Sequence, residues 1–432
     1  MSGFFVVGEK KERPGVYKRY ENAGGVEAAG ARSGVGCALV TGNWGALNTP
    51  VTIDQSTDIS SVIGAGSGHD AITAFMAGGM EECVVVRVGT GGTPATITLK
   101  DTTASTAVDA VVLTALYPGN RAFTITVKAS LDDETAKEAT IYEGTKALEK
   151  VTFAAGKTEV DGIVAAFANS KYVKATKKAP GNGTLADITQ KAFTAGTNPT
   201  ATAAAYGEAA NASEAEVRDM IIVDTNDAAV HTLIATHVAR VFQEGAYTMA
   251  TVAEPSSVAI ETRMQHAAAF NDEKIHYVLN PYIGTDGVEY EGYMLAARIG
   301  GLICAGAANA SLTHTVISGA AGLKETLNSG TIKKALKSGC LVLSTSKSKQ
   351  VWIEKAINTL VTLSKDQDAG WKKIRRVKER FELMDRVEQT TEVLIGQVDN
   401  DTDGRAAVIA AAQRVVDAMV GEKKLLSFMV LK

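Results

Sequence analysis

Short apolar runs alternate with amphipathic segments after Asn211, and this rhythm restricts the possible folds more than any other feature of the chain. Apolar runs predict strands at residues 219–223, 247–253 and 275–279. Helical periodicity predicts helices at residues 228–242, 257–270 and 290–308. Strands that alternate with helices of this length are typical of a mainly parallel sheet that is covered by helices.

An earlier block, residues 34–92, has the same rhythm. It contains predicted strands at 35–40 and 83–88, with a predicted helix at 70–80 between them. Because the pattern stops near residue 92 and resumes after Asn211, we expect both blocks to form one α/β domain that a long insertion interrupts.

The insertion has a different composition, dominated by Thr, Ala, Gly and Lys. Residues 95–100 and 122–128 alternate like half-buried strands, and Tyr117-Pro118-Gly119-Asn120 predicts a turn. The tract 194–205 has few bulky side chains, so we interpret it as a linker. The sequence therefore predicts an inserted β-rich domain with a modest core and a peripheral position.

The stretch 352–395 predicts a helix in its second half, and Asp366 and Asp368 suit the start of that helix. Its apolar residues recur every three or four positions and should share one face: Trp371, Ile374, Val377, Phe381 and Met384. Basic residues lie between them: Lys372, Lys373, Arg375, Arg376, Lys378 and Arg380. In a chain with a formal net charge of -4, this stripe is either a solvated helix face or a docking surface for an acidic partner.

A further helix is predicted at residues 405–420, and both ends of the chain are apolar and strand-like. The residues of these two arms are Phe4, Phe5, Val6 and Val7, and Leu425, Leu426, Phe428 and Val430. Neither segment has an obvious local partner, so each is expected to fray or to pair with something distant. The expected parts are an N-terminal arm (1–22), an α/β domain in two parts (23–92 and 206–345), the inserted β-rich domain (93–205), and a C-terminal α+β domain with the second arm (346–432).

Composition argues against several classes of protein. A pI of about 6.0 is unlike the basic domains of general nucleic-acid binders. The most apolar long stretch, 299–312, is too short to span a membrane and indicates a buried helix. The cysteines are far apart, which indicates free thiols in a reducing compartment: Cys37, Cys83, Cys304 and Cys340. The N-terminus lacks the charge order of a signal peptide, so we expect a chain that stays in the cytosol or leaves it by lysis.

Few residues indicate catalysis or metal binding. The run from Gly64 to Gly68 precedes a helix like a phosphate-binding turn, but there is no Walker lysine, which favours a plain helix entry. Residues 399–404 match half of an EF-hand loop, but Ala410 stands where a bidentate Glu is required. His231 and His237 should lie on opposite faces of one helix. We expect no catalytic residue, metal or cofactor. The alternative is an α/β enzyme with a β insertion that binds an anion near Gly64–Gly68.

Several motifs, in this order, resemble contractile tail sheath proteins: Pro14-Gly15-Val16-Tyr17, Asn43-Trp44-Gly45 and Tyr117-Pro118-Gly119-Asn120-Arg121. The segment AARIGGLICAGAANASLTHTV (296–316) is similar to a small-residue helix and loop in the sheaths of Gram-positive myophages and phage-tail-like bacteriocins. Residues 351–360 and the basic helix are similar to the C-terminal domain of those sheaths. The resemblance covers nearly the whole chain, with departures at Ala46, where proline is common, and at Ala122, where glycine is common.

This resemblance implies a structural subunit and no enzyme activity. Such sheaths are helical stacks of hexameric rings around a tail tube, and they contract to drive the tube through a bacterial envelope. The terminal arms would add strands to neighbouring subunits, and Lys372, Arg375, Arg376 and Lys378 would face the tube. The other implied partners are baseplate and tail terminator proteins, with no nucleic acid and no membrane. The implied location is the tail of a virion or of a phage-tail-like particle that is assembled in the cytoplasm of the bacterial host.

Overall fold

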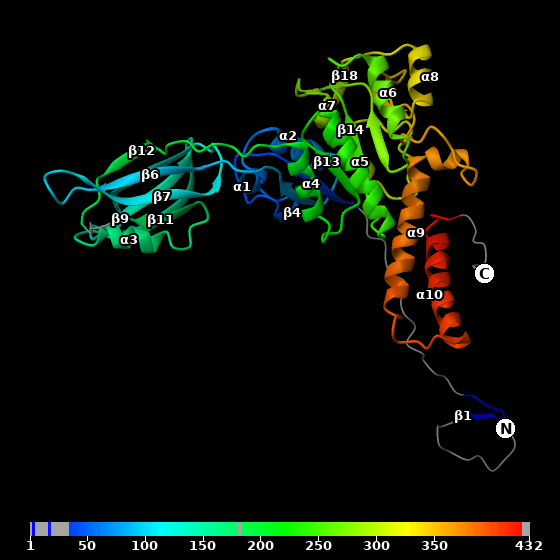
Figure 1. Ribbon diagram of the computed structural model, residues 1–432, viewed down its shortest axis with the longest axis horizontal. Helices are drawn as coiled ribbons and strands as arrows, with labels where there is room; N and C mark the ends of the chain where they lie inside the picture. The colour runs from blue at the N-terminus through cyan, green and yellow to red at the C-terminus, as the bar shows by residue number, and fades with distance from the viewer. Residues whose placement is uncertain (1, 5–15, 19–33, 179–182, 426–432) are drawn as a thin grey trace. The chain divides into compact units, whose positions relative to one another are not determined.

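Figure 1 shows the computed structural model of the 432-residue chain, which describes residues 2–4, 16–18, 34–178 and 183–425. The contacts within the chain divide it into two units. We call residues 33–377 the body, and residues 1–32 together with 378–432 the hairpin unit. Helix α9 (Ile374–Glu392) begins in the body and continues into the hairpin unit.

The centre of the body is a seven-stranded sheet in the order β19-β15-β14-β13-β3-β5-β4. Its strands are β3 (Val35–Val40), β4 (Pro50–Asp54), β5 (Glu82–Arg87), β13 (Met220–Val223), β14 (Met249–Ala253), β15 (Ile275–Val278) and β19 (Cys340–Leu341). All neighbouring pairs are parallel except β4 with β5. Met220 of β13 lies opposite Gly36 of β3, so the two sequence blocks do form one domain, as predicted.

Helices pack on both faces of this sheet (Figure 1). The helices of this domain are α1 (Ile59–Val62), α2 (Ser67–Met76), α4 (Ala203–Ala212), α5 (Ala228–Gln243), α6 (Ile260–Phe270), α7 (Gly292–Ala305) and α8 (Ser329–Lys337). Val35, Cys37 and Leu39 of β3 share one core with α4 and α5. The alternate residue Gly36 faces α2, where a Cβ atom would lie 2.4 Å from the Phe75 ring.

Helix α7 is the small-residue helix of the sequence. Ala296, Ala297, Gly300 and Gly301 are all buried in it. A Cβ atom on Gly301 would lie 2.1 Å from the carbonyl oxygen of Phe75 in α2. The small side chains therefore allow α2 and α7 to pack backbone against backbone on the sheet.

Short strands complete the C-terminal part of the body. Strands β16 (Tyr282–Gly284), β17 (Glu289–Tyr290) and β18 (Ala320–Leu323) form a three-stranded sheet, and β20 (Leu343–Thr345) pairs with β21 (Val351–Ile353). A short 3-10 turn, η1 (Ala369–Lys372), precedes α9. Among the described residues, no helix combines the length and the apolar character needed to cross a membrane.

The insertion is a sandwich of two antiparallel sheets, β10-β9-β8-β12 and β11-β7-β6. Its elements are β6 (Pro94–Asp101), β7 (Val108–Pro118), β8 (Phe123–Ala129), β9 (Ala136–Glu143), β10 (Lys146–Ala154), α3 (Glu159–Ala166), β11 (Val173–Lys177) and β12 (Ile188–Ala192). Bulky side chains such as Phe123, Ile163 and Phe167 fill one core between the sheets and α3. The expectation of a modest core is therefore wrong.

A packed aromatic contact joins the sandwich to the α/β domain. Trp44, from the loop after β3, meets the rings of Tyr117 and Phe123 edge-on at 5.0 and 5.2 Å and stacks on Tyr172 at 5.8 Å. The guanidinium of Arg121 lies 5.1 Å from the Trp44 ring. Trp44 is therefore part of the sandwich core, although the chain places it in the α/β domain.

The connection back from the sandwich is also ordered. Thr96 bridges Thr194 and Thr90 bridges Thr200, so these two segments run antiparallel. Helix α4 then begins at Ala203. The predicted linker at 194–205 is therefore a paired segment followed by the start of a core helix.

The hairpin unit consists of the greater part of α9, helix α10 (Thr402–Gly421), and two short strands near the N-terminus. Strand β1 (Ser2–Phe4) pairs in parallel with β2 (Val16–Lys18). The prediction that the N-terminal arm has no local partner is therefore wrong for Phe4, whose backbone lies opposite Lys18. Leu425 lies beyond α10 and outside any strand. The other arm residues lie outside the described residues: Phe5, Val6, Val7, Leu426, Phe428 and Val430.

Candidate functional site

A carboxylate of the protein itself, that of Asp224, lies beside the start of α2. Asp224 Oδ2 accepts hydrogen bonds from the Thr41 backbone N–H at 2.9 Å and from Ser67 Oγ at 2.7 Å. Asp224 Oδ1 accepts a hydrogen bond from the Tyr206 hydroxyl at 2.6 Å. An internal carboxylate is therefore bound to the Ser67 hydroxyl at the start of α2, next to the turn where the enzyme hypothesis placed an external anion.

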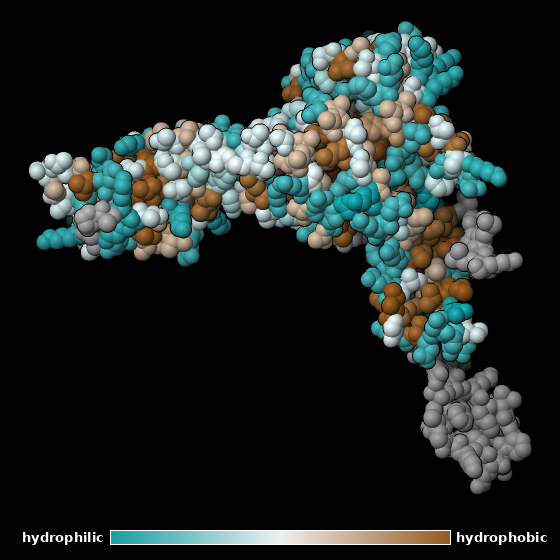
Figure 2. Space-filling view, in the orientation of Figure 1, coloured by the Kyte–Doolittle hydropathy of each residue, from teal (hydrophilic) through white to brown (hydrophobic). Residues whose placement is uncertain are grey.

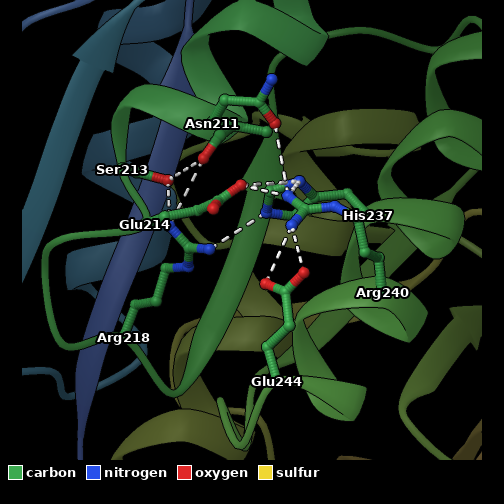
Figure 3. A network of polar contacts seen from close by, with 8 residues as sticks. Asn211, Ser213, Glu214, Arg218, His237, Arg240 and Glu244 are labelled. Carbon is green, nitrogen blue, oxygen red and sulfur yellow. Dashed lines mark hydrogen bonds and ion pairs between the residues drawn. The ribbon is translucent and has the colours of Figure 1, made fainter.

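A buried polar network lies beside α5 (Figure 3). Arg218 is 6% exposed and bonds His237 Nε2 through Nη2 at 3.0 Å. Its Nη1 atom donates to the Ser213 hydroxyl. On the other side of the imidazole, His237 Nδ1 lies 3.8 Å from Glu214 Oε1. These contacts fix the loop that connects α4 to β13.

Although serine, histidine and glutamate meet here, they do not form a nucleophilic triad. Ser213 is fully buried, and its hydroxyl donates to the Ala210 carbonyl at 2.7 Å while it faces Arg218 instead of the imidazole. Burial and the charge of Arg218 lower the pKa of His237 to about 4, so this imidazole is neutral near pH 7. The network is structural.

At the surface, the same network ends in exposed ion pairs. Arg240 bonds both carboxylate oxygens of Glu244, at 2.9 and 3.0 Å, and also pairs with Glu214 (Figure 3). Surface pairs of this kind contribute about 0–1 kcal/mol each. Their stabilising effect on the fold is therefore small, and their main role is to cover the buried Arg218–His237 contact.

The candidate metal sites have structural roles in the described residues. The Asp401 side chain accepts a hydrogen bond from the Gly404 backbone N–H at 2.8 Å and caps α10. His231 Nε2 bonds the Thr225 carbonyl at 3.0 Å. Throughout the described ranges, no three His, Cys, Asp or Glu side chains gather in a way that could hold a metal ion.

The basic residues predicted to face a tube lie around η1 and the start of α9. Lys372 donates from Nζ to the Val361 carbonyl at 2.6 Å. Arg376 pairs with Asp368 at 3.2 Å, and both side chains are more than half exposed. Arg375 is exposed, whereas Lys378 is half-buried and belongs to the hairpin unit.

Positive charge is concentrated at this place. Residues 372–380 contain six Lys or Arg and one Glu. The pKa of Lys373 is lowered by partial burial and by the nearby charges of Lys355 and Arg375. An acidic surface that approached this region would relieve the repulsion among these groups.

The apolar face of α9 is shorter than predicted. Ile374, Val377 and Phe381 are buried, and Trp371 is half-buried in η1, before the helix begins. Met384 is 38% exposed, so its assignment to the buried face is wrong. The next buried side chain after Phe381 is Arg386.

Arg386 belongs to an ionic cluster between α9 and α10. Its guanidinium pairs with Glu382 one turn earlier and bonds both carboxylate oxygens of Glu422 at 2.8 Å. Lys424 Nζ pairs with Glu382 at 2.6 Å and with Glu422 at 2.8 Å. The bonds from Arg386, followed by those from Lys424, lower the pKa of Glu422 to about 2. Sequence reasoning missed this cluster, and the one available signal was the i, i+4 spacing of Glu382 and Arg386.

Comparisons with known proteins identify the two largest parts of the body. The model of the phage tail sheath protein beta-sandwich domain matches residues 90–198, and the model of the phage tail sheath protein central domain matches residues 199–359. Together these adjoining matches cover more than half of the 432 residues. A comparison with curated proteins found no match.

Several solved structures have a similar fold. A sheath tail protein of Desulfitobacterium hafniense matches with a TM-score of 0.75 at 18% identity, over 94% of this chain and 89% of that chain. A sheath tail protein of Listeria innocua matches with a TM-score of 0.70 at 21% identity, over 91% of this chain and 86% of that chain. The PVC sheath complex of an extracellular contractile injection system, in the contracted state, matches with a TM-score of 0.53 at 9% identity, over 98% and 85%. At these identities the likeness concerns the fold.

Proposed function

The chain belongs to the phage tail sheath family, and we propose that it polymerises as stacked hexameric rings around a tail tube. It is a structural subunit of a contractile sheath. The observation that carries the proposal is the pair of adjoining family matches, which span the sandwich and most of the α/β domain. A subunit with head-to-tail contacts that do not close within one ring builds a helical stack.

Tube binding is assigned to Lys372, Arg375, Arg376 and Lys378. The density of positive charge around η1 and α9 supports this assignment, with an acidic tube surface as the partner. Exposed ion pairs of about 0–1 kcal/mol are weak singly but add up when every ring repeats them. Weak contacts also suit a sheath that must release its tube during contraction. Arg375 and Arg376 are the main candidates, because both side chains are exposed, whereas Lys372 and Lys378 are half-buried.

The terminal arms are assigned to contacts between subunits. Within the described residues, strands β1 and β2 form a two-stranded sheet. The outer edge of each strand is therefore available to pair with a third strand. Addition of a neighbour's strand would form main-chain hydrogen bonds worth about 1 kcal/mol each. Deletion of residues 1–12 should therefore give a folded monomer that no longer forms tubes. Tubes from this truncated protein would exclude the assignment.

The remaining partners follow from the sheath role. Baseplate and tail terminator proteins would contact the first and last rings, and neither nucleic acid nor a membrane would be bound. The location would be the tail of a phage or of a phage-tail-like particle, after assembly in the cytoplasm of the bacterial host. The function is mechanical, so no catalytic step is assigned to any residue.

A pair of charge reversals tests the tube contact. The variant Arg375→Glu/Arg376→Glu is mixed with purified tail tube and viewed by negative-stain electron microscopy. Lys347→Glu/Lys349→Glu, at the exposed turn between β20 and β21, makes the same change of charge and is the control. We expect the arginine variant to give sheaths without tubes or contracted sheaths, and the control to give extended sheaths on tubes. Extended, tube-filled sheaths from both variants would show that the basic stripe is only a solvated face.

A further inference from the structure

An apolar cavity lies at the far end of the helical hairpin, around the turn between α9 and α10. Its volume is about 720 Å³, and its apolar lining comes from Leu394, Ile395, Val398, Val408 and Ile409. Ile395 is 79% exposed and Ile409 is 50% exposed. Figure 2 shows apolar residues, coloured brown, gathered over this hairpin. Apolar surface of this kind indicates an interaction site.

The rim of the cavity is acidic. Glu388, Glu392 and Asp399 line it, and Arg405 there is bonded to Asn400. Residues 385–403 contain six Asp or Glu, and their one basic residue is the buried Arg386. Glu392 lies at the C-terminal end of α9, where the helix dipole disfavours a negative charge. Helix stability therefore does not explain Glu392. We call the cavity together with Glu392 and Asp399 the hairpin tip.

The charge of the hairpin tip argues against the tube as its partner. This step rests on the proposed function: a tube surface acidic enough to hold Arg375 and Arg376 would repel Glu392 and Asp399. The hairpin tip therefore needs a basic partner of another kind. In a helical assembly every subunit meets other copies of itself through two different surfaces.

The chain offers a basic surface on α8. Lys333, Lys334 and Lys337 are exposed on this helix, and no Asp or Glu lies within its nine residues. Lys333 and Lys337 are one turn apart and share a face. Lysine side chains can cover apolar surface with their methylene groups while the ammonium groups pair with carboxylates at the rim.

We propose that the hairpin tip of one subunit binds the α8 lysine face of a neighbouring subunit. The apolar side chains of the tip are then covered by the lysine stems, and Glu392 and Asp399 pair with Lys333 and Lys337. The contact joins two different surfaces, so it propagates from subunit to subunit. Its ionic part weakens as salt is added.

Charge reversal and its rescue test this contact in the full-length protein without tube. Glu392→Lys/Asp399→Lys changes the hairpin tip, Lys333→Glu/Lys337→Glu changes α8, and a third variant combines both changes. Asp132→Lys/Glu134→Lys in an exposed loop of the sandwich is the control. The readout is the protein concentration at which sheaths sediment. We expect a rise of roughly tenfold or more in each single-surface variant, and a return close to the unchanged protein in the combined variant and in the control.

Two results would overturn the proposal. One is a combined variant as defective as either single-surface variant, with melting temperatures that show all variants to be folded. The other is a hairpin-tip variant that assembles normally alone and fails only around purified tube, which would assign the tip to the tube.

A cross-linking measurement gives an answer even if the subunits do not form sheaths. Protein labelled with ¹⁵N is mixed with unlabelled protein and treated with a carbodiimide, which joins a carboxylate to a lysine amine. Peptides of mixed isotope that link Glu392 or Asp399 to Lys333 or Lys337 support the contact. Their absence at high protein concentration contradicts it. Failure of the proposed function would be recognised separately, because the unchanged protein would then form no sheaths.

Discussion

The central strands of the body and the contact between α9 and α10 in the hairpin unit differ in the side chains that they bury. In the body, every residue of β13 (Met220–Val223) and of β3 (Val35–Val40) is buried and apolar or glycine. In the hairpin unit, the charged Arg386 is buried between α9 and α10, while Ile395 is 79% exposed. The sheet hides its apolar surface within one subunit, whereas the hairpin leaves part of its apolar surface outside.

This difference indicates what each region is for. Burial of apolar surface is non-directional and gives the body a core that needs no partner. A buried ionic cluster loses solvation and gives little net stability, but it fixes the geometry of the groups that form it. We infer that the body is self-sufficient and that the hairpin presents a defined surface to other molecules.

The largest effect is expected when the hydrogen bonds to Asp224 in the body are removed. Asp224→Ala removes the carboxylate that accepts hydrogen bonds from the Thr41 N–H, the Ser67 hydroxyl and the Tyr206 hydroxyl. Since each hydrogen bond to a charged group contributes about 1.5–3 kcal/mol, we expect a loss of about 4 kcal/mol in the free energy of unfolding of the body. Urea denaturation measures it. Asp132→Ala, in an exposed loop, is the control, and a loss below about 1 kcal/mol in the Asp224 variant would contradict the assigned role.

The next effect separates the two regions. Arg386→Ala leaves Glu382 buried with Lys424 as its remaining ionic partner, so we expect the hairpin to lose about 3 kcal/mol of stability. Hydrogen exchange followed by mass spectrometry should show faster exchange in α9 and α10 and no change in β13. Gln397→Ala, at an exposed position between α9 and α10, is the control and should change exchange neither in these helices nor in β13. Equal loss of protection in β13 would show that the two units unfold together.

Acid should destabilise the body before it destabilises the hairpin. The folded-state pKa of His237 is lowered to about 4. The neutral imidazole therefore contributes fully to the free energy of unfolding above pH 6.5, and this contribution is lost as the pH falls towards 4. The pKa of Glu422 is lowered to about 2, so its contribution is complete above pH 4.5 and is lost as the pH falls towards 2. His237→Gln should reduce the pH dependence of stability between pH 6.5 and 4, and Glu422→Gln should reduce it between pH 4.5 and 2. Unfolding of both regions at the same pH, with neither substitution changing that pH, would contradict this assignment.

The smallest effect on the isolated subunit is expected at the apolar surface of the hairpin. Ile395→Asn should change the free energy of unfolding by less than about 0.5 kcal/mol, because this side chain is already exposed. It should still weaken assembly, which a sedimentation assay measures. Leu131→Asn, at an 88% exposed residue of the sandwich, is the matched control and should leave assembly unchanged. Equal behaviour of the two variants would argue that Ile395 has no partner.

The sequence predicted the elements whose signal is local. Strand β3 (Val35–Val40) and helix α5 (Ala228–Gln243) were placed to within one residue, because a continuous apolar run and a helical period are both visible in a short window. The start of α9 was placed too early. Asp368 caps the 3-10 turn η1 instead, and the α-helix begins only at Ile374.

Features that depend on distant residues were not visible in the sequence. Periodicity assigned Met384 to the buried face of α9, but the structure buries Arg386 because Glu422 and Lys424 come back from the end of α10 to pair with it and its neighbour Glu382. Trp44 contributes to the sandwich core although it precedes that domain in the chain by about fifty residues. Such contacts join positions that no local pattern connects.

Electron microscopy of the purified full-length protein is the most direct test of the central claim, that this subunit assembles through surfaces which its own fold leaves uncovered. Samples are viewed in negative stain over a range of protein concentrations, with and without purified tail tube. The account predicts rings or hollow tubes built from stacked rings. Discrete compact particles at every concentration, with tube present or absent, would contradict it.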